Sequence, residues 1–181
     1  MLRLMLLRHA RAATPAMTAD IDRPLAAQGR QAAAALGAYL ARENLLPDLT
    51  LCSPATRARQ TWELARAELA RAHPGEAFPA ALAPQIYEGG RDGLLHALQD
   101  DHPARTLLAV GHNRGIAALA RALVSHGDRY AFARLSQKFP PGALAVIDLD
   151  VSHWAEIAGR SGRLDRFVTP HALDPELEDV D

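Results

Sequence analysis

Four short runs of apolar residues mark candidate buried strands along the chain. They cover Leu4–Leu7, Leu49–Cys52, Arg105–Val110 and Ala143–Leu149. Continuous apolar runs of this length are typical of strands that are buried on both faces, as in a parallel sheet. The pattern therefore favours a sheet covered by helices on both sides.

Stretches with helical spacing separate these runs. Helices are predicted at residues 25–42, 53–72, 92–99 and 116–124, and loops at 10–24 and 73–84. Ser53 is expected to cap the second helix, with Pro54 in its first turn. Strands that alternate with helices predict an α/β fold, a three-layer α/β/α sandwich with a mostly parallel central sheet.

Length and composition fit one folded unit. The chain has 181 residues, of which 49% are hydrophobic, enough for a sizeable core. We expect a single domain over residues 1–172 and an acidic, frayed C-terminal tail over residues 173–181.

The charge balance excludes one class of partner. Lys and Arg number 20 against 21 Asp and Glu, a formal net charge of −1. A nucleic-acid or membrane-surface binder would need a large excess of bases, so neither partner is expected. Lys138 is the single lysine, so nearly all bases are arginine, which is compositional background except where the arginines cluster.

The cysteine count and the N-terminus indicate the compartment. Cys52 is the single cysteine and cannot form an internal disulfide or a thiolate zinc cluster. No apolar run approaches the roughly 20 residues that span a bilayer, and the first residues do not match a signal peptide. A soluble cytoplasmic protein is expected, and its oligomeric state cannot be predicted.

Reactive side chains follow three of the predicted strands. Arg8 and His9 follow the first, Ser53 and Arg57 the second, and Gly111-His112-Asn113 the third. Ligands of open α/β sheets bind at the carboxyl ends of the strands, so these residues are expected at one edge. Two histidines with arginines and no clustered carboxylates make a positive pocket, and the planar guanidinium suits phosphate oxygens.

Zinc is the competing use of paired histidines. It would need a third or fourth ligand, and the neighbouring cations would repel it. A nucleotide-binding glycine loop does not occur in the sequence either. We therefore expect neither a metal nor a cofactor.

Such a pocket predicts phosphoryl transfer. A neutral imidazole can attack phosphorus in line, while guanidinium groups and a protonated second histidine stabilise the phosphoryl oxygens. The leaving group needs a proton, for which Glu88 is the main candidate. Asp92 is weaker, because an acidic residue there fits the N-terminus of a helix.

Four ordered segments resemble the histidine phosphatase superfamily, also called phosphoglycerate-mutase-like. They are Leu6–Ala10 (Arg-His-Gly signature), Asp22–Gly29 (Arg-Pro-Leu-Thr-x-x-Gly), Ser53–Thr61 (Ser-Pro-x-x-Arg-Ala-x-Gln-Thr) and Val110–Asn113 (Gly-His). The second segment is similar to the small bacterial branch of SixA-type phosphohistidine phosphatases.

The resemblance implies roles for particular residues. His9 would be the nucleophile that becomes phosphorylated, with Arg8, Arg57 and His112 completing the phosphate pocket and Arg23 adding a contact. Asn113 would contact the substrate or shape its turn. Arg59 is expected to face solvent.

Two departures from the family pattern matter. Ala10 stands where the signature has Gly, as also happens in the SixA-like branch. The insertion that carries the catalytic acid in larger members is absent from this chain, so Glu88 is assigned by position alone. A phosphoramidate substrate would need less acid help.

The resemblance implies a metal-independent phosphatase acting on a phosphoprotein, phosphohistidine included, or on a small phosphate ester. One alternative is a phosphate-binding or sensing module without turnover. A phosphoglycerate-type mutase is less favoured, because such mutases have extra segments that enclose the substrate.

Overall fold

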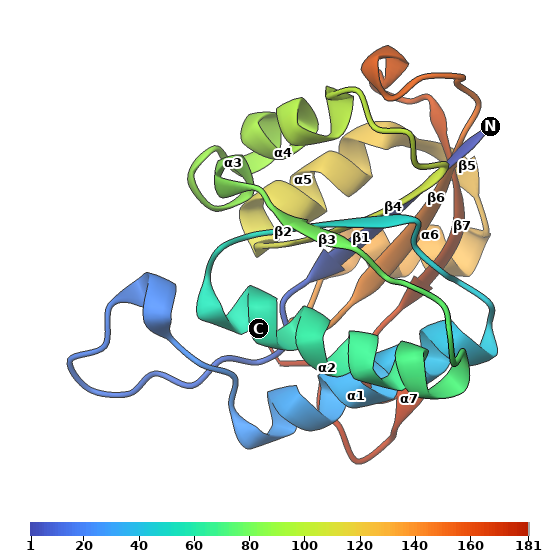
Figure 1. The fold of residues 1–181 in the computed structure, drawn as a ribbon. Coiled ribbons are helices and arrows are strands. Elements are labelled where there is room, and N and C mark those ends of the chain that lie inside the picture. Colours follow the sequence, from blue (N-terminus) through green and yellow to red (C-terminus); the bar gives the residue numbers. More distant parts are fainter. Residues whose placement is uncertain (181) are drawn as a thin grey trace.

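One mixed sheet forms the centre of the computed structural model, which describes residues 1–180 (Figure 1). Its seven strands are β1 (Leu2–Arg8), β2 (Leu49–Cys52), β3 (Ala80–Leu82), β4 (Thr106–Gly111), β5 (Val124–Gly127), β6 (Leu144–Leu149) and β7 (Gly162–Val168). Their order across the sheet is β3-β2-β4-β1-β6-β7-β5. Only β6 runs antiparallel to its neighbours, β1 and β7, so the sheet is mostly parallel as predicted.

Helices cover both faces of this sheet. They are α1 (Ala27–Arg42), α2 (Thr56–Ala72), α3 (Pro84–Glu88), α4 (Gly90–Gln99), α5 (Asn113–Leu123), α6 (Arg129–Gln137) and α7 (Pro170–Leu173), with short 3₁₀ turns η1 (Asp20–Asp22) and η2 (Trp154–Glu156). α1 and α2 pack on one face, and α3 to α6 pack on the other (Figure 1). This is the predicted three-layer sandwich. Within residues 1–180, none of the helices is long and apolar enough to cross a membrane.

The apolar run of β1 is buried because the strand lies at the centre of the sheet. Leu4 and Leu6 belong to the core under α4 and α5, whereas Met5 and Leu7 belong to the core under α1 and α2. Alternate side chains of a strand point to opposite faces, so a run buried on both sides must be continuously apolar. This is why β1, β2, β4 and β6 could be predicted.

Several elements differ from the prediction. The expected loop at residues 73–84 contains β3, and β5, α6 and β7 were not predicted at all. α2 begins at Thr56 and its N-cap, Ala55, has no side-chain cap, so the expected cap at Ser53 is wrong.

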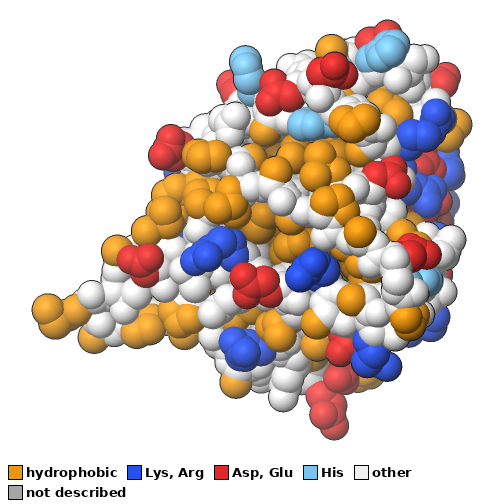
Figure 2. Space-filling model, in the orientation of Figure 1, with side chains coloured by type: hydrophobic (Ala, Val, Ile, Leu, Met, Phe, Trp, Pro, Cys, Tyr) orange, Lys and Arg blue, Asp and Glu red, His pale blue; other side chains and the backbone are white. Residues whose placement is uncertain are grey.

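A long connection between β1 and α1 projects from the body of the molecule. It covers residues 11–24 and appears in blue in Figure 1. Hydrophobic side chains cover much of the same projection in Figure 2, and Met17 is fully exposed. The connection turns back through η1, which brings Asp20 to the carboxyl edge of the sheet.

Residues 173–180 pack against the body, although fraying was predicted for residues 173–181; residue 181 lies outside the described residues. Leu177 is 3% exposed and joins the small apolar cluster that includes Ala10 and Leu25. The Asp179 carboxylate accepts a hydrogen bond from the backbone N–H of His171 at 2.9 Å. One buried leucine therefore anchors a segment whose charge suggested solvent exposure.

Candidate active site

The carboxyl ends of β1, β2 and β4 bring three reactive side chains together. Arg8 pairs with Gly111 between the parallel strands β1 and β4, so the residues that follow, His9 and His112, lie side by side. Their ring centroids are 5.2 Å apart. Ser53 follows β2, and its Oγ lies 2.8 Å from Nε2 of His112.

Contacts from distant segments fix the turn that carries His9. The backbone N–H of Gly142 donates to the carbonyl oxygens of both Arg8 and His9, at 3.1 and 3.0 Å. Gly142 has φ of +82°, a conformation that favours glycine. The backbone N–H of Ala10 donates to the buried Thr61 hydroxyl at 3.0 Å. Thr61 therefore positions the turn after His9.

Arg57, in the first turn of α2, links the two histidines. It is 6% exposed. Its Nε donates to His9 Nε2 at 3.3 Å, and its Nη2 donates to His112 Nδ1 at 3.3 Å. The structure thus brings together three of the residues that the sequence singled out. Arg59, two positions along the helix, is exposed as expected.

These contacts define the histidine tautomers. A guanidinium has no acceptor, so each histidine nitrogen that faces Arg57 must be unprotonated. His9 therefore carries its proton on Nδ1, which donates to the Ala10 carbonyl at 2.8 Å. His112 carries its proton on Nε2, which donates to Ser53 Oγ. His9 Nε2 is therefore unprotonated, and its lone pair, which here accepts the hydrogen bond from Arg57, becomes available for nucleophilic attack when that contact is released.

Both histidines are neutral in the protein without substrate. Burial, with smaller contributions from His112, Arg57 and Arg8, lowers the pKa of His9 to about 3. Burial and the positive charge of Arg57 lower the pKa of His112 to about 4. The expectation of a protonated second histidine concerns the state with a bound phosphoryl group, and for that state it stays a prediction.

A carboxylate that was not predicted lies on Arg57. Arg57 Nη2 donates to Asp20 Oδ2 at 3.0 Å, and Arg57 Nη1 donates to the Asp20 backbone carbonyl at 2.6 Å. The Tyr87 hydroxyl donates to the same Oδ2 at 2.9 Å, and Arg23 Nη1 donates to Oδ1 at 3.1 Å. The tyrosine hydrogen bond and the two guanidiniums lower the pKa of Asp20 to about 2. The sequence had suggested that this edge of the sheet has no carboxylates beside the arginines, and Asp20 shows that it has one.

The sequence carried a weak signal for Asp20. It lies three residues before Arg23, a residue assigned to the site, but in a loop without periodicity. Arg23 contacts Asp20 and, through Nε, the Ala13 carbonyl at 3.1 Å. Arg23 therefore contacts its own loop, including Asp20. These contacts position the Asp20 carboxylate beside the Arg57 guanidinium.

The remaining candidates lie at the edge of the site. Arg8 is half-buried, and its Nη1 donates to the Phe139 carbonyl at 2.8 Å. Asn113 is exposed at the start of α5. Glu88 is exposed at the end of α3, next to Tyr87. Among residues 1–180, no cluster of three or more His, Cys, Asp or Glu has an arrangement that could hold a metal ion.

Comparisons with known proteins agree with this architecture. A family model of the histidine phosphatase superfamily (branch 1) matches residues 4–77, which include His9 and Arg57. An uncharacterised Mycobacterium tuberculosis protein, Rv1276c, is 35% identical over 167 residues, which cover 91% of this chain and 99% of the relative.

Solved structures give the same result. A candidate phosphohistidine phosphatase SixA from Nakamurella multipartitia is 30% identical, with a TM-score of 0.74 over 93% of this chain and 96% of that one. Another candidate SixA, from Agrobacterium tumefaciens, is 28% identical, with a TM-score of 0.74 over 93% of this chain and 98% of that one.

Proposed function

The chain belongs to the SixA-type branch of the histidine phosphatase superfamily and is a phosphatase, and from this premise we propose that it hydrolyses phosphohistidine through a phosphorylated His9. The physiological substrate would be a phosphoprotein, with small phosphate esters as the second candidate class. The single observation that carries the proposal is the unprotonated His9 Nε2 beside the Arg57 guanidinium.

In the first step, His9 Nε2 attacks phosphorus in line. A new phosphorus–nitrogen bond forms to His9, and the bond to the leaving group breaks with its electron pair. Arg57 and Arg8 would hold the phosphoryl oxygens and stabilise their charge in the transition state. His112 Nδ1, which accepts from Arg57 in the unliganded protein, would take up a proton and donate a hydrogen bond to the same oxygens.

In the second step, water attacks the phosphoryl group on His9. The water oxygen bonds to phosphorus, the bond to Nε2 breaks, and the electron pair returns to the imidazole. The proton of the water stays with the released phosphate or passes to solvent. His9 is then neutral again, as burial requires.

The surroundings of the pocket support a nitrogen leaving group. An alkoxide leaving group needs an acid catalyst beside its oxygen. A phosphohistidine can instead take up a proton from solvent on its other ring nitrogen, because the ordinary pKa of imidazole is about 6.5, and the ring then leaves as neutral imidazole. Asp20 contacts Arg57 but has a pKa of about 2, so it cannot donate a proton near neutrality. Glu88 is exposed and would be the remaining donor for an ester.

A substrate panel with a nucleophile variant tests the proposal. A phosphohistidine peptide, an aryl phosphate and an alkyl phosphate are assayed with wild type, His9→Ala, and His96→Ala as a control at an exposed helix position. We expect His9→Ala to lose all turnover, while wild type and His96→Ala hydrolyse the peptide fastest. An acid-labile phosphoryl group should be trapped on wild type but not on His9→Ala.

Two results would overturn the proposal. Unchanged turnover in His9→Ala would exclude His9 as the nucleophile. Complete loss of wild-type turnover in EDTA, restored by zinc or magnesium, would indicate a metal phosphatase. Binding of phosphate without turnover of any substrate would instead support the phosphate-binding module.

A further inference from the structure

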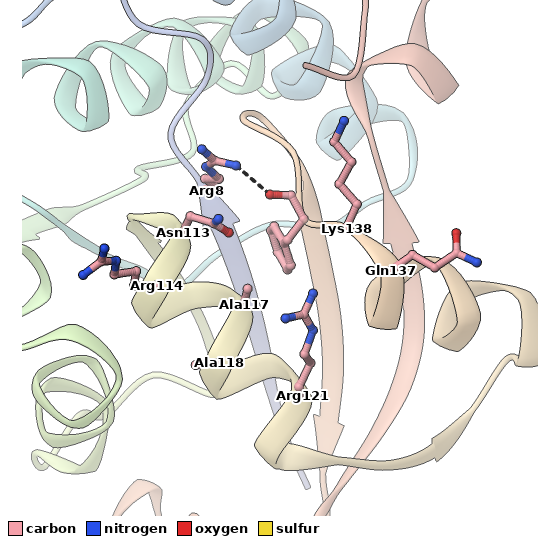
Figure 3. A pocket seen from close by; sticks show the side chains of 9 residues that line it. Arg8, Asn113, Arg114, Ala117, Ala118, Arg121, Gln137 and Lys138 are labelled. Carbon is pink, nitrogen blue, oxygen red and sulfur yellow. Dashed lines mark hydrogen bonds between the residues drawn. The ribbon is translucent and has the colours of Figure 1, made fainter. Parts of the chain in front are cut away.

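A cavity of about 340 Å³ adjoins the candidate active site at Arg8 and Asn113 (Figure 3). It lies between α5 and the segment that connects α6 to β6. Its lining residues are Arg8, Asn113, Arg114, Ala117, Ala118, Arg121, Gln137, Lys138 and Phe139. Arg8 is shared with the proposed phosphate pocket, whereas the two histidines and Arg57 do not belong to this set, so the cavity adjoins the phosphate pocket and extends beyond it.

The lining is strongly positive. It contains four basic side chains and two amides but no aspartate or glutamate. A neighbouring cavity near α1 and β7 instead combines arginines with Asp128 and Asp165. In a chain with a formal net charge of −1, this local excess of bases stands out.

Two of the basic side chains, Arg114 and Arg121 of α5, are placed to donate to a ligand. Arg121 extends from α5 toward the 137–139 segment in Figure 3. Its Nε donates to the Leu135 carbonyl at 3.1 Å, which holds the side chain in place while its two terminal nitrogens point away from that bond. Arg114 is exposed about two turns earlier on the same helix.

Two residues connect the cavity to the site of chemistry. Arg8 directly precedes the proposed nucleophile His9, and Asn113 directly follows His112. Both line the cavity. A substrate with its phosphoryl group at His9 could therefore reach past Arg8 and Asn113 and place a second anionic group in the cavity.

We propose that this basic cavity is a second anion subsite, which binds a carboxylate or phosphate that the substrate carries near the scissile phosphoryl group. The inference rests on the proposed function and narrows its substrate class to molecules with two anionic groups. The second anion would come from an acidic side chain of a phosphoprotein or from a second acidic group of a small phosphate ester. Guanidinium groups recognise both through the same charge-assisted hydrogen bonds.

The test compares substrates that differ only in the second anion. One pair is a phosphohistidine peptide flanked by Glu and its counterpart flanked by Gln. The other pair is a sugar bisphosphate and the matching monophosphate. The variants are Arg114→Gln/Arg121→Gln and Arg121→Lys, and para-nitrophenyl phosphate reports the basal chemistry.

A matched control removes the same charge elsewhere. Arg30→Gln/Arg66→Gln changes two exposed arginines on α1 and α2, on the opposite face of the sheet. Thermal melting of each variant checks that the Leu135 contact of Arg121 is not needed for folding. Arg121→Lys keeps the charge and serves as the variant of choice if the glutamine variant unfolds.

The cavity variant should lower kcat/KM about tenfold for the doubly anionic member of at least one pair, mainly through KM. The kcat/KM of the counterpart that lacks the second anion, and that of para-nitrophenyl phosphate, should be unchanged in the cavity variant. In the control variant, kcat/KM should be unchanged for every substrate. A loss confined to the peptide pair would identify a protein source of the anion, and a loss confined to the sugar pair a small-molecule source. Equal effects on both members of each pair, or none, would overturn the subsite.

Failure of the subsite and failure of the proposed function give different results. If the subsite is absent, His9-dependent hydrolysis of phosphohistidine continues and both members of each pair respond alike. If the proposed function is wrong, phosphohistidine peptides are not hydrolysed through His9, whatever happens at the cavity.

Discussion

The Asp20 carboxylate lies 3.0 Å from the Arg57 guanidinium, the group that also links His9 and His112. The Asp20 backbone carbonyl accepts a second hydrogen bond from Arg57. All the nitrogens of this guanidinium therefore have partners before any substrate binds. A phosphoryl group that uses Arg57 must displace Asp20 or share the guanidinium with it.

Replacing Asp20 with asparagine should tighten phosphate binding. The carboxylate repels an incoming dianion, and two charges about 4 Å apart in a solvated site interact by about 1 kcal/mol, roughly a fivefold change in affinity. Because Asp20 is largely exposed, the solvated value is the appropriate one. We expect Asp20→Asn to lower the KM for an aryl phosphate, and the inhibition constant of inorganic phosphate, by about that factor.

Asp22→Asn is the control for this measurement, because Asp22 is an exposed carboxylate in the same turn. A higher KM in Asp20→Asn would show that the carboxylate assists substrate binding, contrary to the prediction. An equal effect in Asp22→Asn would indicate only the net charge of the loop.

Arg57 and Arg59 provide a second matched comparison. They lie two residues apart on α2, one buried between the histidines and the other exposed. Losing a positioned donor to the transition-state oxyanion costs about 10²–10³-fold in rate. We expect a fall of that size in kcat for Arg57→Ala and no change for Arg59→Ala, measured with an aryl phosphate. Comparable losses in both variants would contradict the assignment of Arg57.

The parts of the fold that could be predicted depend on local sequence. β1, β4 and β6 each contain a continuous apolar run, because both faces of the strand are buried along Leu4–Leu7, Leu107–Val110 and Leu144–Ile147. Since parallel strands end at the same edge, the residues after β1 and β4 could be placed together before their geometry was known. That argument brought His9 and His112 together.

The missed elements depend on contacts between distant segments. β7 alternates apolar residues with charged ones, and its Arg163 contacts Asp148 of β6 at 2.7 Å. An ion pair between strands thus covers a face that looks solvent-exposed in the sequence. Asp20 was missed for the same reason, since its partner Arg57 lies 37 residues away and the loop that carries Asp20 has no periodicity.

Glu88 was assigned by its position in the sequence, and its role depends on the leaving group. The leaving imidazole of a phosphohistidine can take its proton from solvent on the other ring nitrogen, so Glu88→Gln should hydrolyse a phosphohistidine peptide at the same rate as wild type at each pH. With an alkyl phosphate, loss of a general acid would cost about 10²-fold or more and remove a limb of the pH–rate profile. Asp92→Asn, at the start of α4, is the control. Equal losses with both substrates would place Glu88 in another role.

The two histidines should remain neutral well below their ordinary pKa. In the folded protein the pKa of His9 is about 3 and the pKa of His112 is about 4, whereas the pKa of a histidine in an unfolded chain is about 6.5. Between pH 6.5 and 4 the unfolded state therefore binds more protons, so the free energy of unfolding decreases as the pH falls through this window.

NMR titration measures the charge of the two imidazoles directly. The imidazole signals of His9 and His112, assigned with the variants His9→Ala and His112→Ala, should stay unchanged from pH 7.5 to 5. A bound phosphate dianion should raise the pKa of His112, because it places negative charge beside Nδ1. Titration of either free histidine near pH 6.5 would show that the imidazoles are solvated, and the neutral resting state of the nucleophile would have to be abandoned.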